Sequence, residues 1–205
     1  MIASKFLPVA LIFMAISVSA RSQNQKETLD VPESEFTETV FFVSTKNEPV
    51  KLEYNRASFK AKKNALSVFS GGKLGRSGTK LMVAGPSSTI HLEESDKMRF
   101  IYTAPDNSSN PDSKIVLYKF DLTPDQNRVT TVSENVGALA GDKSAFQNIV
   151  KYDVRKYKQT SYLLTIDKME AGEYGFILDL NKGFGTKNSN EAPIVYMFSV
   201  ITAVK

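Results

Sequence analysis

The chain has 205 residues, a formal net charge of +4, and no cysteine or tryptophan. Without cysteine it can form neither disulfide bonds nor thiolate metal sites, and it cannot carry a lipid on a cysteine. Hydrophobic residues make up 41% of the chain, a content that supports a buried core and argues against wholesale disorder.

The first 20 residues predict a cleavable secretory signal peptide. Lys5 provides a positive charge before an apolar run over residues 6–18, and Val18 and Ala20 fill the minus-three and minus-one positions of the cleavage site. The run is shorter than the roughly 20 residues that span a bilayer. We therefore expect an exported protein, periplasmic, at the cell surface or extracellular, with no transmembrane segment after cleavage. Export without cysteine favours a bacterial envelope protein.

Residues 21–35 are polar and predict a flexible leader, after which strand patterns dominate. Short runs of β-forming residues recur about every ten residues and amount to about ten strands. The predicted strands cover residues 39–44, 50–54, 80–84, 88–92, 98–103, 114–122, 128–132, 149–157, 161–166, 173–180 and 194–200.

This spacing predicts an all-β fold, an antiparallel β-sandwich of Greek-key or immunoglobulin-like type, formed by residues 36–205 as a single domain. Little helix is expected. Asp142 or Ser144 is a suitable cap for a turn or two of helix over residues 142–149. Residues 59–69 fit either a strand or a helix.

The stretch GGKLGRSGTK, residues 71–80, is rich in glycine and basic residues, as phosphate-binding loops are. Its spacing matches neither a Walker A loop nor a dinucleotide fingerprint. Thr79 stands where a nucleophile elbow needs its second glycine. The residues that follow are strand-like, whereas a phosphate loop precedes a helix. We interpret the stretch as a connection between strands, with anion binding by exposed backbone N–H groups as the alternative.

Positive charge is concentrated in residues 46–80, which hold nine basic and two acidic residues. Such a segment is either a solvated face or a surface for anions such as lipopolysaccharide, acidic glycan or membrane headgroups. In the second case, binding should fall steeply with salt. No nucleic-acid partner is expected. The candidate anion-binding residues are Lys60, Lys62, Lys63, Lys73, Arg76 and Lys80.

Metal and catalytic signals are weak. His91, the only histidine, shares a strand face with Glu93, but a zinc site needs a third protein ligand that the sequence does not identify. The loop over residues 106–112 offers oxygen ligands, yet Pro111 and Leu117 stand where an EF-hand needs glycine and glutamate. We expect no cofactor, no metal and no catalytic residue. A hydrolase whose carboxylate pair forms only in space is the remaining alternative.

The segment around GEYGF predicts a structural corner. Glu170, Gly172, Tyr174 and Phe176 fall where immunoglobulin-like domains place an acidic residue, a glycine, the corner tyrosine and the second core cysteine. This resemblance to the tyrosine corner implies that the Tyr174 hydroxyl bonds back to upstream backbone. Because Phe176 replaces the cysteine, it implies no inter-sheet disulfide.

A second resemblance covers residues 166–176 together with the Tyr196-Met197-Phe198 strand. These segments are similar to the GEY and Tyr-x-Phe ending of uncharacterised exported β-sandwich proteins from Bacteroidota-type bacteria, with Met169 and Ala171 in place of a leucine and a proline. The resemblance implies an envelope protein and assigns no active site. We therefore predict an exported, non-catalytic binding or structural module of the bacterial cell envelope, whose partner is an envelope protein or an anionic glycan or lipid surface.

Overall fold

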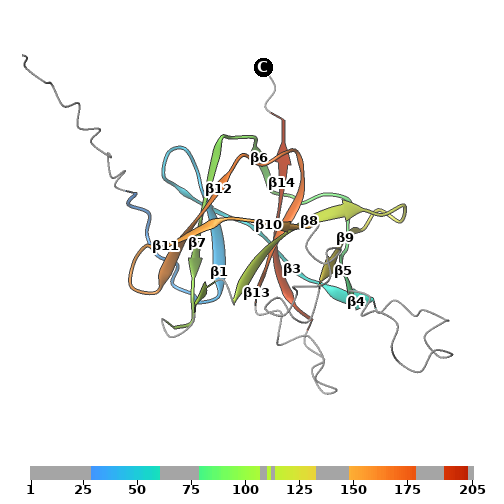
Figure 1. The fold of residues 1–205 in the computed structure, drawn as a ribbon, viewed down its shortest axis with the longest axis horizontal. Coiled ribbons are helices and arrows are strands. Elements are labelled where there is room, and N and C mark those ends of the chain that lie inside the picture. Colours follow the sequence, from blue (N-terminus) through green and yellow to red (C-terminus); the bar gives the residue numbers. More distant parts are fainter. Residues whose placement is uncertain are drawn as a thin grey trace, which may run out of the picture.

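A computed structural model describes residues 29–60, 79–106, 110–111, 114–132, 148–178 and 192–202 (Figure 1). These residues form 14 short strands and no α-helix. The strands are β1 (Thr39–Val43), β2 (Pro49–Lys51), β3 (Glu53–Arg56), β4 (Ser58–Lys60), β5 (Thr79–Val83), β6 (His91–Glu93), β7 (Lys97–Thr103), β8 (Ile115–Leu122), β9 (Arg128–Val132), β10 (Ile149–Val150), β11 (Asp153–Lys156), β12 (Ser161–Asp167), β13 (Gly172–Leu178) and β14 (Ile194–Ile201).

The strands form two facing sheets. One has five strands in the order β11-β12-β7-β1-β2. The other has nine, in the order β3-β14-β13-β8-β9-β5-β4, with β10 beside β8 and β6 beside β14. Every pairing is antiparallel except that of β6 with β14. The predicted all-β sandwich is therefore confirmed.

The strand count exceeds the prediction because two predicted strands each divide between the sheets. The run over residues 50–54 becomes β2 and β3, which meet at the buried Leu52. The run over residues 149–157 becomes β10 and β11, separated by Lys151 and Tyr152. At these two corners the chain crosses from one sheet to the other and closes a side of the sandwich. β4 overlaps the first two residues of the stretch 59–69 that fitted either structure, and the rest of that stretch lies outside the described residues. The predicted helix also falls largely outside them.

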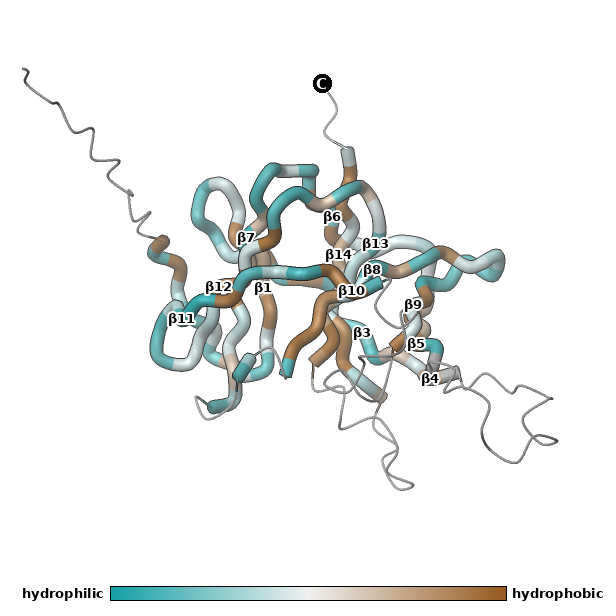
Figure 2. The backbone as a smooth tube through the Cα atoms, viewed as in Figure 1, coloured by the Kyte–Doolittle hydropathy of each residue, from teal (hydrophilic) through white to brown (hydrophobic). Residues whose placement is uncertain are grey.

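The main core lies between the sheets and is centred on aromatic rings. The Phe100 ring lies 5.0 Å from the rings of both Phe176 and Phe198, measured between centroids. All three are fully buried, and Met98 and Leu164 pack with them. Figure 2 shows the hydrophobic residues concentrated along the central strands. Inward-facing residues alternate with outward ones, as the period-two sequence pattern predicts.

A second core lies on the other face of the nine-stranded sheet. Val116, Tyr118 and Phe120 of β8 alternate with residues of the main core and pack with Leu81 of β5 and Val132 of β9. Since both faces of β8 are covered, the nine-stranded sheet must curl so that its β9-β5-β4 end folds back over its own outer face.

The outer face of the five-stranded sheet is covered by residues 29–35. Val31 is fully buried and packs against Phe41, Ile101 and Leu163. Its backbone N–H donates to the Tyr157 hydroxyl at 2.7 Å. The packed domain thus extends upstream of residue 36, where the sequence pattern placed its start. Because the segment is mostly polar, its sequence does not indicate that Val31 is buried.

The GEYGF segment makes the contact that defines a tyrosine corner. The Tyr174 hydroxyl donates to the Glu170 carbonyl at 2.8 Å, and its ring stacks on Phe198 at 5.7 Å. Gly172 has φ +155°, a backbone conformation that side chains disfavour. At Gly175, a Cβ atom would lie 2.5 Å from the Met197 sulfur, so only glycine fits between the packed strands.

We expect Tyr174→Phe to lower the free energy of unfolding by about 1–2 kcal/mol, because it leaves the Glu170 carbonyl without its donor. Urea denaturation measures the change. Tyr54→Phe is the matched control, since that ring is 51% exposed. Equal unfolding midpoints for wild type and Tyr174→Phe would show that the corner hydrogen bond adds no stability.

Candidate functional site

Two hollows lie at the two corners where the chain changes sheets. The first, which we call the aromatic groove, has a volume of about 450 Å³ and lies beside the β2–β3 corner. The second, which we call the charged pocket, has a volume of about 590 Å³ and lies at the β10–β11 corner. Both volumes fall in the range of small-ligand sites.

The aromatic groove carries exposed rings on its rim. Phe36 is 72% exposed and Tyr54 is 51% exposed. The Tyr54 ring meets that of Tyr196 edge-on at 5.8 Å, and the Tyr196 hydroxyl donates to the Glu38 carbonyl at 3.0 Å. Lys51 lines the same groove and is exposed. Two rings are thus free to stack on a ligand beside one positive charge.

One wall of the groove is the segment over residues 32–36, which the Glu33 side chain ties to β12. The Glu33 carboxylate accepts a hydrogen bond from the Ser161 hydroxyl at 2.6 Å, and this bond lowers the pKa of Glu33. Thr160 donates its N–H to the same carboxylate at 3.3 Å. Phe36 lies three residues after Glu33 in the chain, so this tie also holds the part of the wall that carries Phe36. Its setting in a polar stretch gave the sequence analysis no signal for a binding residue.

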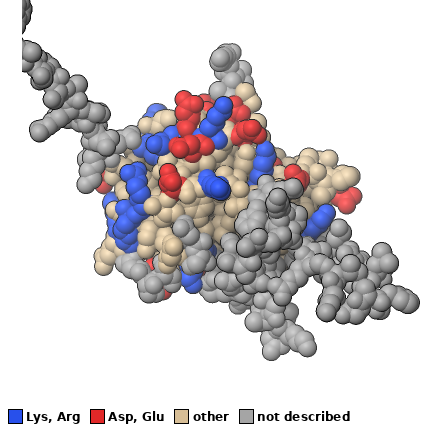
Figure 3. All heavy atoms as spheres, in the orientation of Figure 1, with Lys and Arg blue, Asp and Glu red and all other residues tan. Residues whose placement is uncertain are grey.

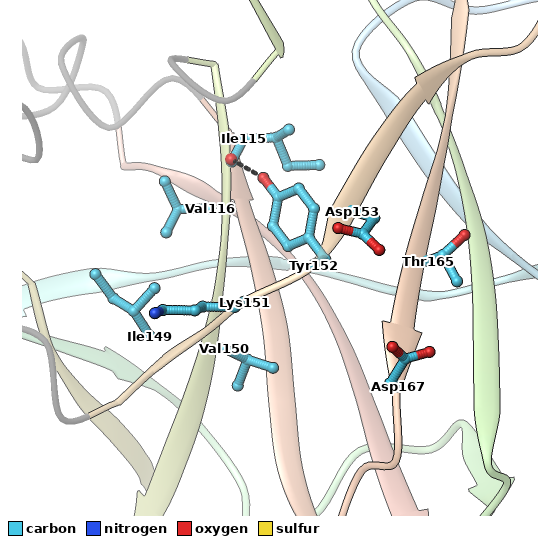
Figure 4. A pocket seen from close by; sticks show the side chains of 9 residues that line it. All are labelled: Ile115, Val116, Ile149, Val150, Lys151, Tyr152, Asp153, Thr165 and Asp167. Carbon is cyan, nitrogen blue, oxygen red and sulfur yellow. Dashed lines mark hydrogen bonds between the residues drawn. The ribbon is translucent and has the colours of Figure 1, made fainter.

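The charged pocket brings together residues from four strands, β8, β10, β11 and β12, and from the crossover between β10 and β11. Asp153 of β11 is the cross-strand partner of Thr165 on β12, and Asp167 lies two residues further along that strand. Alternation therefore puts the three side chains on one face. Lys151 lies in the crossover between β10 and β11, and its side chain runs toward Ile149, away from the two aspartates (Figure 4). The Tyr152 hydroxyl donates to the Ile115 carbonyl and so ties the crossover to β8.

Asp153 and Asp167 bear on the alternative of a hydrolase with a carboxylate pair. They line one pocket, but both side chains are exposed to solvent. A carboxylic acid that donates a proton at neutral pH is kept protonated by an apolar, shielded setting. The pocket does not supply that setting, so its geometry fits binding better than acid catalysis.

A buried ion network joins the strands of the curled sheet. Arg128 of β9 is 2% exposed, and its Nη2 lies 3.1 Å from a Glu53 oxygen. Its Nη1 lies 3.7 Å from a Glu173 oxygen. Nη2 also donates to the Ala84 carbonyl at 2.8 Å. The Ser88 N–H donates to Glu173 at 2.9 Å, so the loop over residues 84–90 is tied to the same network.

The pKa of Glu53 reports the strength of this network. Burial alone would raise the pKa, but hydrogen bonds outweigh burial and lower it from 4.5 to about 2. The groups that supply these hydrogen bonds are the Ser88, Asn55 and Arg128 side chains and the Thr89 backbone. Glu53 is therefore ionised in the folded protein across the physiological range.

The predicted anion-binding residues fall mostly outside the described part of the chain. Lys62, Lys63, Lys73 and Arg76 lie there, as does most of the glycine-rich stretch. Lys60 and Lys80 are direct cross-strand partners on β4 and β5. Whether the basic segment binds anions stays a prediction.

The remaining predicted residues do not assemble a metal site. His91 and Glu93 are exposed on β6, and part of the loop over residues 106–112 lies outside the described residues. Over the described ranges, no three His, Asp or Glu side chains group in a way that could hold a metal ion. Figure 3 shows acidic side chains near β6, where Glu94, Asp96 and Glu170 line a third hollow of about 640 Å³.

Neither a family model nor a curated protein matches the chain. In the residues that the structure covers, no helix is long and apolar enough to cross a membrane. The predicted signal peptide lies outside those residues and stays a prediction.

We expect Arg128→Ala to lower the free energy of unfolding by about 3–5 kcal/mol, because it removes a buried side chain and leaves two partly buried carboxylates, each 16% exposed, without their cation. Urea denaturation measures the loss, with the exposed Arg155→Ala as the control. Combining Arg128→Met with Glu53→Gln and Glu173→Gln should recover most of it, since no buried charge then remains. A loss no larger than that of the control would contradict a stabilising network.

Glu53 should make stability sensitive to acid. Because its folded pKa of about 2 lies below the unfolded value, the stability that it contributes is present above about pH 4.5 and is lost as pH falls toward 2. The free energy of unfolding, measured against pH for wild type and Glu53→Gln, tests this. The difference between the two proteins should shrink over that window, and a constant difference would contradict the assignment.

Proposed function

We propose that the protein is an exported, non-catalytic binding module and that the aromatic groove is its ligand-binding surface. The observation that carries this proposal is the exposure of Phe36 and Tyr54, at 72% and 51%, on the rim of one hollow. Exposing two large rings on the lining of one hollow costs hydrophobic free energy, and clustered exposure of this kind marks interaction sites. The predicted signal peptide supports export.

The ligand we propose is an acidic glycan of the cell envelope. The apolar faces of sugar rings pack against aromatic faces, which the groove offers at Phe36 and Tyr54. Lys51 lies in the same groove and can pair with a sugar carboxylate. Of the two carboxylates in the groove wall, Glu33 is already bound by Ser161 and Thr160, whereas Glu35 is exposed. The groove therefore combines stacking surfaces with one exposed cation, Lys51, and one exposed carboxylate, Glu35.

Binding of an oligogalacturonide to the mature protein, followed by calorimetry, tests the proposal. Phe36→Ala and Tyr54→Ala should each weaken binding about tenfold, because each removes a stacking surface. Lys51→Met should abolish the preference for the acidic sugar over its carboxyl-reduced, neutral counterpart. Added salt should weaken binding of the acidic form only.

Leu122→Ala is the matched control, since Leu122 is 52% exposed and does not line the groove. Undiminished binding by Phe36→Ala and Tyr54→Ala would refute the groove as the binding surface. Loss of binding on charge reversal at Lys73, Arg76 and Lys80, with the ring variants unaffected, would assign it instead to the basic segment. Binding of neither sugar would refute a glycan ligand.

A further inference from the structure

The charged pocket holds three ionic side chains that are not paired with one another. Lys151, Asp153 and Asp167 all line it and are exposed. Among the described residues, no ion pair or hydrogen bond satisfies any of the three side chains. Lys97 is the β7 partner of Asp167, on the side of β12 away from Asp153, and it too forms no ion pair within the described chain.

The charges are separated within the pocket. In Figure 4 the Lys151 side chain runs toward Ile149, on the opposite side of the Tyr152 ring from Asp153 and Asp167. The Tyr152 ring is fixed by its hydrogen bond to Ile115 and its edge contact with Phe176. Apolar side chains form the remaining walls. They are those of Ile115, Val116, Ile149 and Val150.

A further polar group lies on β12, two residues before Asp167. Thr165 is only 7% exposed, yet it lines the pocket opposite Asp153. Its hydroxyl forms no hydrogen bond among the described residues, and its oxygen is not one of the buried atoms that lack a partner, so water can reach it. A ligand in the pocket can take the place of that water as the hydroxyl's partner. This observation is independent of the carboxylates.

We propose that the charged pocket binds a short peptide with free termini. The peptide's ammonium group lies between Asp153 and Asp167, where Thr165 is an additional acceptor. Its carboxylate pairs with Lys151, and its aliphatic body contacts the apolar wall. The volume of about 590 Å³ suits a ligand of a few residues. This site is separate from the aromatic groove and does not depend on the function proposed for it.

Other classes of ligand fit the pocket less well. A divalent cation prefers several oxygen ligands and would face Lys151 as a like charge. A simple anion would be repelled by two carboxylates. A neutral ligand would leave three charged groups unused. A ligand with opposite charges at its two ends uses both sides of the pocket.

The test is calorimetric titration of the mature protein with Ala-Leu-Ala, its N-acetyl form and its C-terminal amide. Each blocked form should bind about tenfold more weakly than the free peptide, because each loses one charge-assisted contact. Asp153→Asn with Asp167→Asn should weaken the free peptide and remove the penalty for acetylation only. Lys151→Met should remove the penalty for amidation only. Thr165→Val should weaken the free peptide and the amide alike.

Asp125→Asn and Lys46→Met are the matched controls, since these residues are exposed and do not line the pocket. Phe36→Ala should bind the peptides as wild type does, which distinguishes this site from the groove. The proposal is overturned if the free peptide does not bind at millimolar concentration. It is also overturned if both blocked forms bind as tightly as the free peptide, or if the pocket variants behave like the controls.

Discussion

The buried charge of Arg128 determines how the rest of this fold can be arranged. In the nine-stranded sheet, β3 and β9 are separated by β14, β13 and β8, so in a flat sheet they would lie roughly 19 Å apart. The 3.1 Å contact between Arg128 and Glu53 is therefore possible only because the sheet curls. A guanidinium that is excluded from water destabilises the fold unless its carboxylate partners stay beside it. Keeping those partners in place requires the curl of the sheet, and with it the second core and the position of the loop over residues 84–90.

Part of this architecture follows from the sequence alone. Strand positions could be predicted because apolar and polar residues alternate. The resemblance of GEYGF to a tyrosine corner implied a bond from the Tyr174 hydroxyl to upstream backbone, and the structure shows that the acceptor is the Glu170 carbonyl. The curl could not be predicted. The partners of Arg128 lie 75 residues before it and 45 residues after it in the sequence, and no local pattern connects them. For the same reason a β-forming run that crosses between sheets looks like one strand.

The candidate sites were hidden for a related physical reason. Lys151, Asp153 and Asp167 are unremarkable as sequence, and they meet only because the crossover places the end of β12 beside the start of β11. Phe36 stands alone in a polar stretch, and its neighbours in the groove come from β3 and β14. The basic and glycine-rich segment could be recognised in the sequence because its charged residues lie close together along the chain. Residues that come together only when the sheets close are far apart in the sequence, so neither hollow could be predicted from it.

The groove keeps its shape only while residues 29–36 remain packed on the five-stranded sheet. Removal of the predicted signal peptide after Ala20 leaves this segment intact, but cleavage a few residues beyond Val31 would detach it from Tyr157 and β12. Such trimming would release the Glu33 anchor of the wall that carries Phe36 and expose Phe41, Ile101 and Leu163 to water. A protease acting on this stretch would therefore loosen one wall of the groove and create an exposed apolar surface in one step.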